Sequence, residues 1–465
     1  MKKFIGDKTF YRMVLTIAVP MMIQNGVTNL VSFLDNIMIG QVGTEQMSGV
    51  AIVNQLIFVF NLSIFGIVSG ASIFGTQFYG KRDFVGMRHA FQFKIIACLV
   101  ATIASAALLF FFKDSLIALY LHSGNTGENL QLALQSGQEF LTIMILGLFP
   151  FAISQVYAST IREMGKTVVP MFASSIGVVT NTVLNYLLIF GHFGAPVLGV
   201  RGAAIATVIA RFVECFIIVY WVHRHNTENP FVIGAFRQWR LPKKLVLQII
   251  KTGAPLMANE ILWASGMTII LQAYSVRGLT VIAGINIAST ISNIFNILFL
   301  ALGGATAVIV GQLLGANKMA EAKDSARKII FFSVASCFVI GVLMFAIAPM
   351  FPSIYNTSEE VKTLASSFIR VAAICMPIYA FNHASYFVLR SGGKTMITFL
   401  FDSVFIWVII LPLAFFLSTH TQLPIVTVYF ICQFVEIIKS IIGYFLVRSS
   451  AWLENIVVEN EATET

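Results

Sequence analysis

The chain has 465 residues, of which 57% are hydrophobic and only 11% are charged. A soluble globular protein has about 25% charged residues. The composition therefore excludes a string of soluble domains, which would lack the polar side chains to cover their surface. The apolar segments are continuous runs rather than alternating patterns, which argues against a membrane β-barrel. The remaining class is an integral membrane protein built from helices.

The net charge of +9 does not indicate a nucleic-acid-binding protein, because the basic residues are scattered over many short loops. All five cysteines lie in apolar segments, and an odd number there argues against a disulfide framework. The basic N-terminus continues into a long apolar segment without a small-residue cleavage site, so we expect the first helix to be retained.

Twelve apolar runs separated by polar breaks predict twelve membrane-spanning helices, each of which needs about 20 residues. In chain order the expected spans are 14–38, 50–76, 90–112, 133–158, 168–191, 202–222, 246–273, 282–312, 329–350, 363–388, 397–417 and 425–447.

The distribution of Lys and Arg predicts the orientation. Most of the 30 basic residues fall at the N-terminal end or in the loops after even-numbered spans, and Lys94 is counted among them. The loops of the opposite side hold Lys113, Arg201, Arg277 and Lys362. The positive-inside rule therefore predicts a multi-pass protein of the plasma (inner) membrane with both termini in the cytoplasm.

The polar segment 223–245 divides the chain into two parts of similar length. We interpret it as a cytoplasmic linker between an N-lobe (1–222, spans 1–6) and a C-lobe (246–450, spans 7–12). The acidic, polar residues 451–465 predict a disordered cytoplasmic tail.

The two halves repeat each other. Five residues recur 235 positions later: Pro20, Gly43, Gly49, Gln77 and Gly80 match Pro255, Gly278, Gly284, Gln312 and Gly315. Arg162, Gly165, Lys166 and Thr167 recur 228 positions later, and Phe212-Val213-Glu214 recurs 222 positions later. Six spans per repeat is an even number, so both halves insert in the same orientation. We expect an all-α fold of two six-helix lobes related by a pseudo-two-fold along the membrane normal, as in transporters.

The residues from Leu34 to Gly43 resemble the first-helix motif of multidrug and toxic compound extrusion (MATE) transporters. The stretches 181–185, 202–207 and 311–316 resemble further motifs of this family, and the likeness extends from Asp7 to about Arg448. The resemblance implies efflux by antiport against a cation, without a cofactor and without enzyme activity. It leaves open whether the coupling ion is Na⁺ or H⁺ and what the cargo is.

Asp35 lies near the outer end of the first span. Insertion of an ionisable side chain at bilayer depth costs about 2.5–3.5 kcal/mol, so such a residue usually has a function or a compensating partner. Asn181 and Asn185 share one helical face. The resemblance implies that Asp35, Asn181, Asn185 and Thr207 line a cation site, and the first three could hold Na⁺. Some family members have Asp at the position of Asn185, so this chain has one carboxylate fewer. Helix–helix packing by Asn and Thr is the alternative interpretation.

Glu260 occupies the repeat position of Asn25 and resembles a functional glutamate in one branch of the family. That branch also has an Asp in the tenth span, where this chain has Asn382-His383. Glu260 is therefore a candidate cation-coupling residue, and a second ion site in the C-lobe stays an open question.

Polar residues at similar depth are candidates for a substrate cavity: Gln24, Asn25, Asn259 and His383. Pro20 removes a helical hydrogen bond and allows a bend, which the resemblance links to protonation. Three further acidic residues receive structural interpretations. Asp402 is read as an interfacial carboxylate, and Glu214 and Glu436 as partners of Arg211 and Lys439 on their own helices.

The function that these features favour is a secondary active multidrug exporter, in which two lobes rock and a cation binds at Asp35 and Glu260. The expected partners are organic cations or amphiphilic drugs and membrane lipid, and the expected state is a monomer. A flippase of lipid-linked precursors is the alternative, although it would need a strongly cationic cavity. A membrane-embedded enzyme is a distant alternative, since no paired His/Glu metal motif is present.

Overall fold

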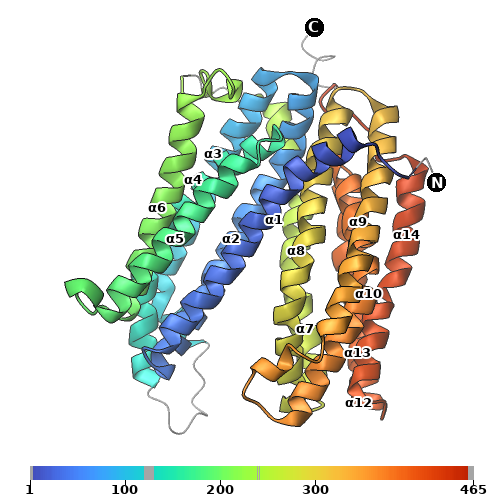
Figure 1. The fold of residues 1–465 in the computed structure, drawn as a ribbon. Coiled ribbons are helices and arrows are strands. Elements are labelled where there is room, and N and C mark those ends of the chain that lie inside the picture. Colours follow the sequence, from blue (N-terminus) through green and yellow to red (C-terminus); the bar gives the residue numbers. More distant parts are fainter. Residues whose placement is uncertain (1–3, 120–129, 238, 240, 459–465) are drawn as a thin grey trace. The chain divides into compact units, whose positions relative to one another are not determined.

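The structure is a computed structural model that describes residues 4–119, 130–237, 239 and 241–458, without the side chains of Ser32, Phe33, Asn36, Thr44 and Leu130. All regular structure in these residues is helical (Figure 1). The predicted number of twelve spans is confirmed, since twelve segments of the described chain are long and apolar enough to cross a membrane. The first ten are α1 (Lys8–Gly40), α2 (Thr44–Lys81), α3 (Phe84–Ala118), α4 (Leu130–Glu163), α5 (Val168–Phe190), α6 (Val200–Arg224), α7 (Lys243–Ser275), α8 (Leu279–Gly315), α9 (Met319–Ile347) and α10 (Glu359–Ser391).

The last two spans are built from several pieces. The eleventh contains α11 (Thr395–Phe399), two π-helical stretches, η4 (Leu400–Val404) and η5 (Ile406–Ile410), and α12 (Leu411–His420). The twelfth contains α13 (Ile425–Phe434) and α14 (Glu436–Ser449), joined through Val435, whose dihedral angles remain helical. Short helices lie in three connections: η1 (His192–Gly194), η2 (Pro230–Val232) and η3 (Pro352–Ile354).

Most of the helices are longer than the expected spans. Helices α2 and α8 have 38 and 37 residues, whereas a crossing needs about 20. The connection between α2 and α3 therefore shrinks to Arg82 and Asp83, and the Asp83 side chain caps α3 by accepting a hydrogen bond from the Gly86 N–H at 2.8 Å. Lys94, which the charge count assigns to a loop although it falls within the expected span 90–112, lies inside α3 and is fully buried.

Internal contacts divide the chain into two compact units. The N unit contains Ile23–Gly75 and Asp83–Leu247, and the C unit contains Met1–Met22, Thr76–Arg82 and Gln248–Thr465. These boundaries differ from the expected lobes, because the first part of α1 and the end of α2 belong to the C unit. The division of α1 falls two residues after Pro20, which lies inside the helix.

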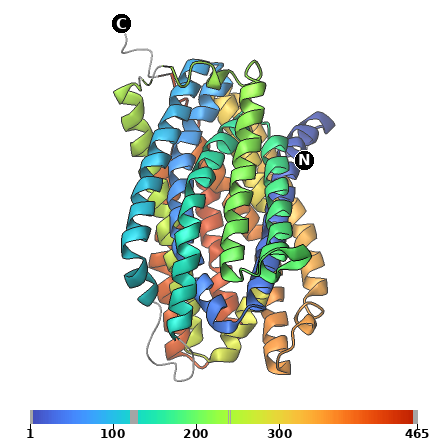
Figure 2. The same ribbon diagram turned by 90° about the vertical axis from the view of Figure 1, so that its left-hand side faces the viewer.

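The N unit is held together by α4, which packs against α3 and α6, and by α5, which packs along α6 (Figures 1 and 2). The connection after α6 is folded onto α3. Phe231 is fully buried, with its ring centroid 4.9 Å from that of Phe91, and Gln92 donates a hydrogen bond to the Ala235 carbonyl at 2.7 Å. The segment interpreted as a linker thus belongs to the N unit.

A buried ion pair joins α3 to α4 in the N unit. The Lys94 ammonium contacts the Glu163 carboxylate, and their side chains are 0% and 4% exposed. The ammonium also lies 3.1 Å from the Thr160 hydroxyl and 3.3 Å from the Ser159 hydroxyl. Burial of a charge in a low dielectric is tolerated here because the partner and the hydroxyl groups compensate it.

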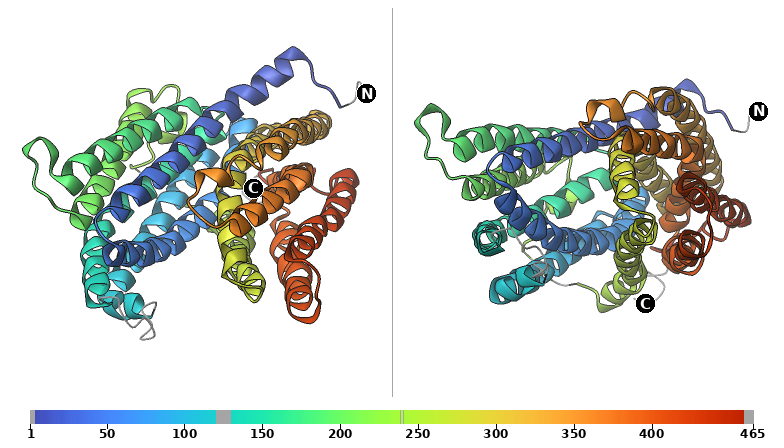
Figure 3. Two further views of the ribbon diagram at one scale, coloured as in Figure 1. Left: turned by 60° about the horizontal axis from the view of Figure 1, so that its bottom comes forward. Right: turned by 90° about the horizontal axis from the view of Figure 1, so that it is seen from below.

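The C unit is built around α10, which packs along both α8 and α9 (Figures 1 and 3). Its main apolar core draws on α7, α8, α10 and the last two spans, and includes Ile270, Phe299, Phe368 and Ile410. The first part of α1 adds Val14, which packs with residues of α8 in a second cluster.

The ends of α2 and α8 cross within the C unit at two glycines. A Cβ atom at Gly80 would overlap the Gln312 carbonyl, and one at Gly315 would overlap the Gln77 carbonyl. Only glycine allows such a close approach of two backbones. Because Gly80 and Gln77 are the repeat mates of Gly315 and Gln312, the contact is reciprocal, as a two-fold relation between repeats requires.

The chain after α14 is folded as far as Val458. Trp452 is fully buried, and its indole N–H donates to the Val447 carbonyl at 2.9 Å. The Ile456 N–H donates to the Gln77 side-chain oxygen at 3.0 Å, and Lys394 pairs with Glu454. The prediction of a disordered tail is therefore wrong for residues 451–458, because this acidic segment also contains apolar side chains, Trp452 and Val457, that are buried. Residues 459–465 lie outside the described part.

Replacement of Trp452 by Ala should lower the free energy of unfolding of the detergent-solubilised protein by about 3–5 kcal/mol, because it empties a fully buried site. Thermal unfolding followed by intrinsic fluorescence measures the effect. Trp263→Ala is the matched control, since Trp263 is 41% exposed. Equal unfolding midpoints for the two variants would contradict the burial of Trp452.

Replacement of Lys94 by Met should cost about 3–5 kcal/mol of stability, because it leaves the Glu163 carboxylate buried without its cation. The double variant Lys94→Met/Glu163→Gln should recover most of this loss, since it removes both charges. A double variant as unstable as Lys94→Met in the same unfolding assay would show that packing, rather than charge compensation, sets the cost.

Candidate cation site

Three helices of the N unit bring four of the predicted residues together. Asp35 comes from α1, Asn181 and Asn185 from α5, and Thr207 from α6. The Asn185 side-chain amide donates a hydrogen bond to Asp35 Oδ1 at 2.7 Å, and Asn181 and Asn185 are 5% and 1% exposed. The predicted helical face of α5 is therefore directed at the carboxylate of α1.

The Asn181 amide completes the site. Its Nδ2 donates to both carboxylate oxygens of Asp35, at 2.9 and 3.0 Å, and its Oδ1 accepts from the Thr207 hydroxyl at 3.1 Å. The acceptor-only carboxylate is thus faced by the amide N–H groups of both asparagines.

No basic side chain compensates Asp35 among the described residues, in which it forms no ion pair. Asn185 Oδ1 is buried and accepts no hydrogen bond within the same part of the chain. The described residues also contain no group of three or more His, Cys, Asp or Glu side chains that could hold a metal ion together. A cation at this site would thus be held by one carboxylate together with amide and hydroxyl oxygens, the ligand type that hard cations prefer.

The second half of the chain does not repeat this constellation. At the same sequence offsets, the four polar residues of the site correspond to apolar or aromatic residues of the C-unit core: Ile270, Ile409, Leu413 and Tyr429. A site of the Asp35 type is therefore a property of the N unit.

Glu260 is the fifth predicted coupling residue and belongs to the C unit. It lies on α7 and is half-buried. The attractive charge of Arg390 and the repulsive charge of Asp402 both act on it. Glu260 therefore has a basic group in its surroundings, in contrast to Asp35.

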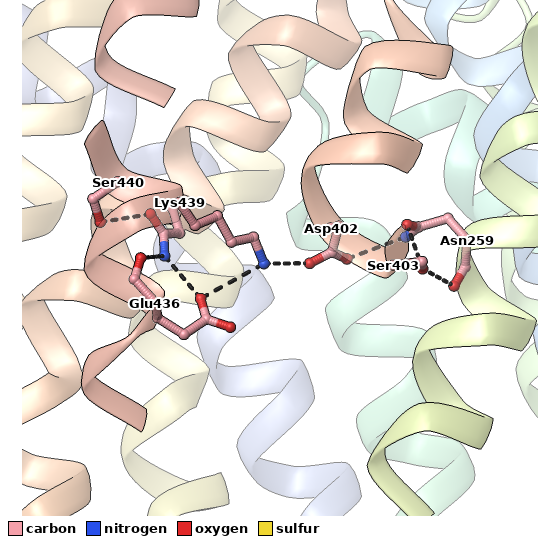
Figure 4. Close-up of polar contacts among 7 residues, drawn as sticks. Asn259, Asp402, Ser403, Glu436, Lys439 and Ser440 are labelled. Atoms are coloured by element: carbon pink, nitrogen blue, oxygen red, sulfur yellow. Dashed lines mark hydrogen bonds and ion pairs between the residues drawn. The ribbon is translucent and has the colours of Figure 1, made fainter. Parts of the chain in front are cut away.

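Next to Glu260, a polar network joins α7 to the last two spans (Figure 4). The Asn259 amide donates to Asp402 Oδ2 at 3.2 Å, and the Lys439 ammonium donates to Asp402 Oδ1 at 2.6 Å. The Ser403 hydroxyl lies 2.7 Å from Asn259 Oδ1. The interpretation of Asp402 as an interfacial carboxylate is wrong, because both of its oxygens are bound inside the helix bundle.

The network continues from Lys439 to α10. The Lys439 ammonium lies 3.6 Å from Glu436 Oε2, which accepts a hydrogen bond from the Asn382 amide at 2.8 Å. Asn382 Oδ1 accepts from the Ser440 hydroxyl at 2.7 Å. The predicted pair of Glu436 and Lys439 is confirmed, but Asp402 on another span is the closer partner. Sequence spacing reveals neighbours on one helix and gives no signal for a pair between helices.

The candidate cavity residues have different surroundings. Gln24 accepts a hydrogen bond from Arg162 at 2.9 Å, and Asn25 is exposed. His383 packs edge-on against Phe299 and Phe387, with ring centroids 5.2 and 4.9 Å away, and its buried Nε2 has no partner in the described chain. Asn259 is committed to the network described above.

A pocket of about 550 Å³ lies in the N unit between α3, α4 and α6. Its walls are apolar and include Leu99, Tyr157, Phe216 and Trp239, and none of the candidate cavity residues lines it. No charged side chain lines it either, so this pocket offers no ion-coupling chemistry.

Solved structures share this fold. A MATE transporter in complex with MaL6 aligns with a TM-score of 0.85 at 19% identity, over 97% of this chain and 98% of that chain. The outward-facing conformation of a multidrug resistance MATE family transporter of the MOP superfamily gives 0.85 at 18% identity, with the same coverage. A MOP superfamily transporter from Pyrococcus furiosus gives 0.83 at 19% identity, also over 97% and 98%.

Relatives of similar sequence are named as transporters and not as enzymes. A probable multidrug resistance protein NorM of Thermotoga maritima is 23% identical over 451 residues, which cover 96% of this chain and 94% of the relative. An uncharacterized transporter, YisQ, of Bacillus subtilis is 22% identical over 449 residues, 97% of this chain and 96% of the relative. The MatE family model matches residues 20–187 and 255–416. Since these matches take in more than half of the chain and both of its repeats, the chain belongs to the MatE family of multidrug transporters.

Proposed function

We propose that this protein exports organic cations or amphiphilic compounds across the plasma membrane, driven by a cation, Na⁺ or H⁺, that binds at Asp35. The observation that carries the proposal is the carboxylate of Asp35, which the amides of Asn185 and Asn181 contact and no ion pair compensates in the described chain. A charge inside a membrane protein is costly unless something neutralises it. A transported cation or proton is the neutralising species that we infer.

The two asparagine amides support an ionised, empty state of Asp35. Nδ2 of Asn181 donates to both carboxylate oxygens, at 2.9 and 3.0 Å, and the Asn185 amide donates to Oδ1 at 2.7 Å. A proton or Na⁺ that binds at the carboxylate competes with these neutral donors and not with a fixed positive charge.

Helix α1 is the element through which we expect occupancy of Asp35 to act on alternating access. Its residues up to Met22 belong to the C unit and those from Ile23 onward to the N unit. Pro20 lies two residues before that division and removes one helical hydrogen bond, so bending is cheaper there than elsewhere in α1. We propose that ion binding at Asp35 favours one bend of α1, and with it one arrangement of the lobes during rocking.

The same carboxylate suggests the class of cargo. An unneutralised acid in a membrane-spanning helix attracts cationic amphiphiles, which would compete with the coupling ion for Asp35. The relatives are named as probable multidrug resistance proteins, which agrees with a set of cargo molecules of different chemical structures.

Replacement of Asp35 by Asn should leave membrane abundance unchanged, because Asn is nearly isosteric and removes a desolvated charge. Gradient-driven dye efflux should fall to the level of vesicles that lack the protein. The measurement is dye transport by inverted vesicles, under a Na⁺ gradient and, separately, a pH gradient, which also identifies the ion.

The matched control is Asp114→Asn. Asp114 is exposed and, like Asp35, accepts a hydrogen bond from a side-chain amide, that of Gln138 at 2.8 Å. This variant should transport at the wild-type rate. Wild-type rates in Asp35→Asn vesicles under both gradients would reject Asp35 as the coupling site.

The proposed orientation is tested by impermeant thiol reagents in a variant without the five native cysteines. Cysteine at Leu279, which is 83% exposed before the eighth span, should be labelled from outside intact cells, and cysteine at Ala316 should be protected. Labelling of the Ala316 position in intact cells, with protection of the Leu279 position, would reverse the topology.

A further inference from the structure

We propose that the ammonium of Lys439 is a built-in cation that fills, in the C unit, the place of a transported ion, so that ion coupling is confined to Asp35. This inference rests on the proposed function, in which Asp35 is the coupling site. Lys439 is 5% exposed, and its Nζ lies 2.6 Å from Asp402 Oδ1 and 3.6 Å from Glu436 Oε2 (Figure 4).

The groups around this ammonium are those of a hard-cation site. Two carboxylates face Nζ, and each is completed by a side-chain amide, from Asn259 for Asp402 and from Asn382 for Glu436. Each amide oxygen accepts a hydrogen bond from a serine hydroxyl: Ser403 donates to Asn259, and Ser440 donates to Asn382. Removal of the lysine charge would leave two buried carboxylates and no cation between them.

The backbone is irregular at the first of the two carboxylates. Asp402 and Ser403 lie in the π-helical stretch η4. π-helical turns inside α-helices are rare and frequent at functional sites. The other carboxylate, Glu436, begins α14 after Val435, whose dihedral angles are helical.

The first repeat has no equivalent of this lysine. The offset of 222 that matches Glu214 to Glu436 places Ile217 at the position of Lys439. The N unit therefore has an ion-free carboxylate at Asp35, whereas the C unit has a carboxylate that already holds a cation. Because both arrangements occur in one duplicated chain, the difference points to coupling in one half.

The test is Na⁺ binding to a Lys439→Met variant, made in the Asp35→Asn background so that the N-unit site does not contribute. Thermal unfolding of purified protein is compared in NaCl and in choline chloride at equal ionic strength. We expect Na⁺ to raise the unfolding midpoint of the Lys439→Met protein by about 3 °C or more, because it binds the folded state alone. The parent with Lys439 should show no difference between the salts.

Two control variants separate ion binding from a general salt effect. Lys439→Arg keeps the charge and should not respond to Na⁺. Lys439→Met/Asp402→Asn removes the closest carboxylate together with the ammonium and should lose the response. If Lys439→Met is too unstable in choline chloride, the yield of monodisperse protein purified in each salt replaces the unfolding midpoint, and NaCl should raise it.

The proposal would be overturned if Na⁺ stabilised Lys439→Met and Lys439→Met/Asp402→Asn equally. It would also be overturned if Na⁺ changed neither the unfolding midpoint nor the yield of Lys439→Met. These outcomes are independent of transport. A failure of Asp35→Asn to lose efflux would reject the proposed coupling site, while the Na⁺ response of the Lys439→Met protein would still decide whether its ammonium occupies a cation site.

Discussion

The structure depends on one constraint: a charge inside the membrane must be compensated by the protein, because no water is present to do so. Lys94 with Glu163 and Lys439 with Asp402 meet this constraint in full, with side chains between 0% and 21% exposed. Asp35 meets it only through neutral amides. Asp35 has no counter-ion in the described chain, and this is why we propose that it gains and loses a small cation during a transport cycle.

The twelve membrane-spanning helices were predictable, because the length and hydrophobicity of each segment are read along the chain. The grouping of Asp35 with Asn181 and Asn185 was accessible through the family resemblance, whereas spacing alone places only the two asparagines on one helical face. The ion pairs Lys94–Glu163 and Asp402–Lys439 could not be predicted from the sequence, because each joins two different helices. Their partners are 69 and 37 residues apart, and nothing in either local pattern marks them.

The duplication has kept the backbone contacts and changed the chemistry. Gly80 and Gly315 are both retained, because the crossing of α2 and α8 has no room for a side chain at either position. Asp35, by contrast, corresponds to the buried Ile270 in the second repeat. Packing between the repeats thus constrains the glycines of both repeats, whereas the polar residues of the Asp35 site are present in only one repeat.

The folded segment after α14 has a consequence for biosynthesis. Gln77 belongs to the second span, yet its side chain bonds the Ser391 and Glu454 carbonyls, at 2.9 and 3.2 Å, and the Ile456 N–H. These partners follow Gln77 by 314 to 379 residues. The end of α2 therefore leaves the ribosome long before its hydrogen bonds can form, and the C unit is completed only once the segment after α14 has emerged.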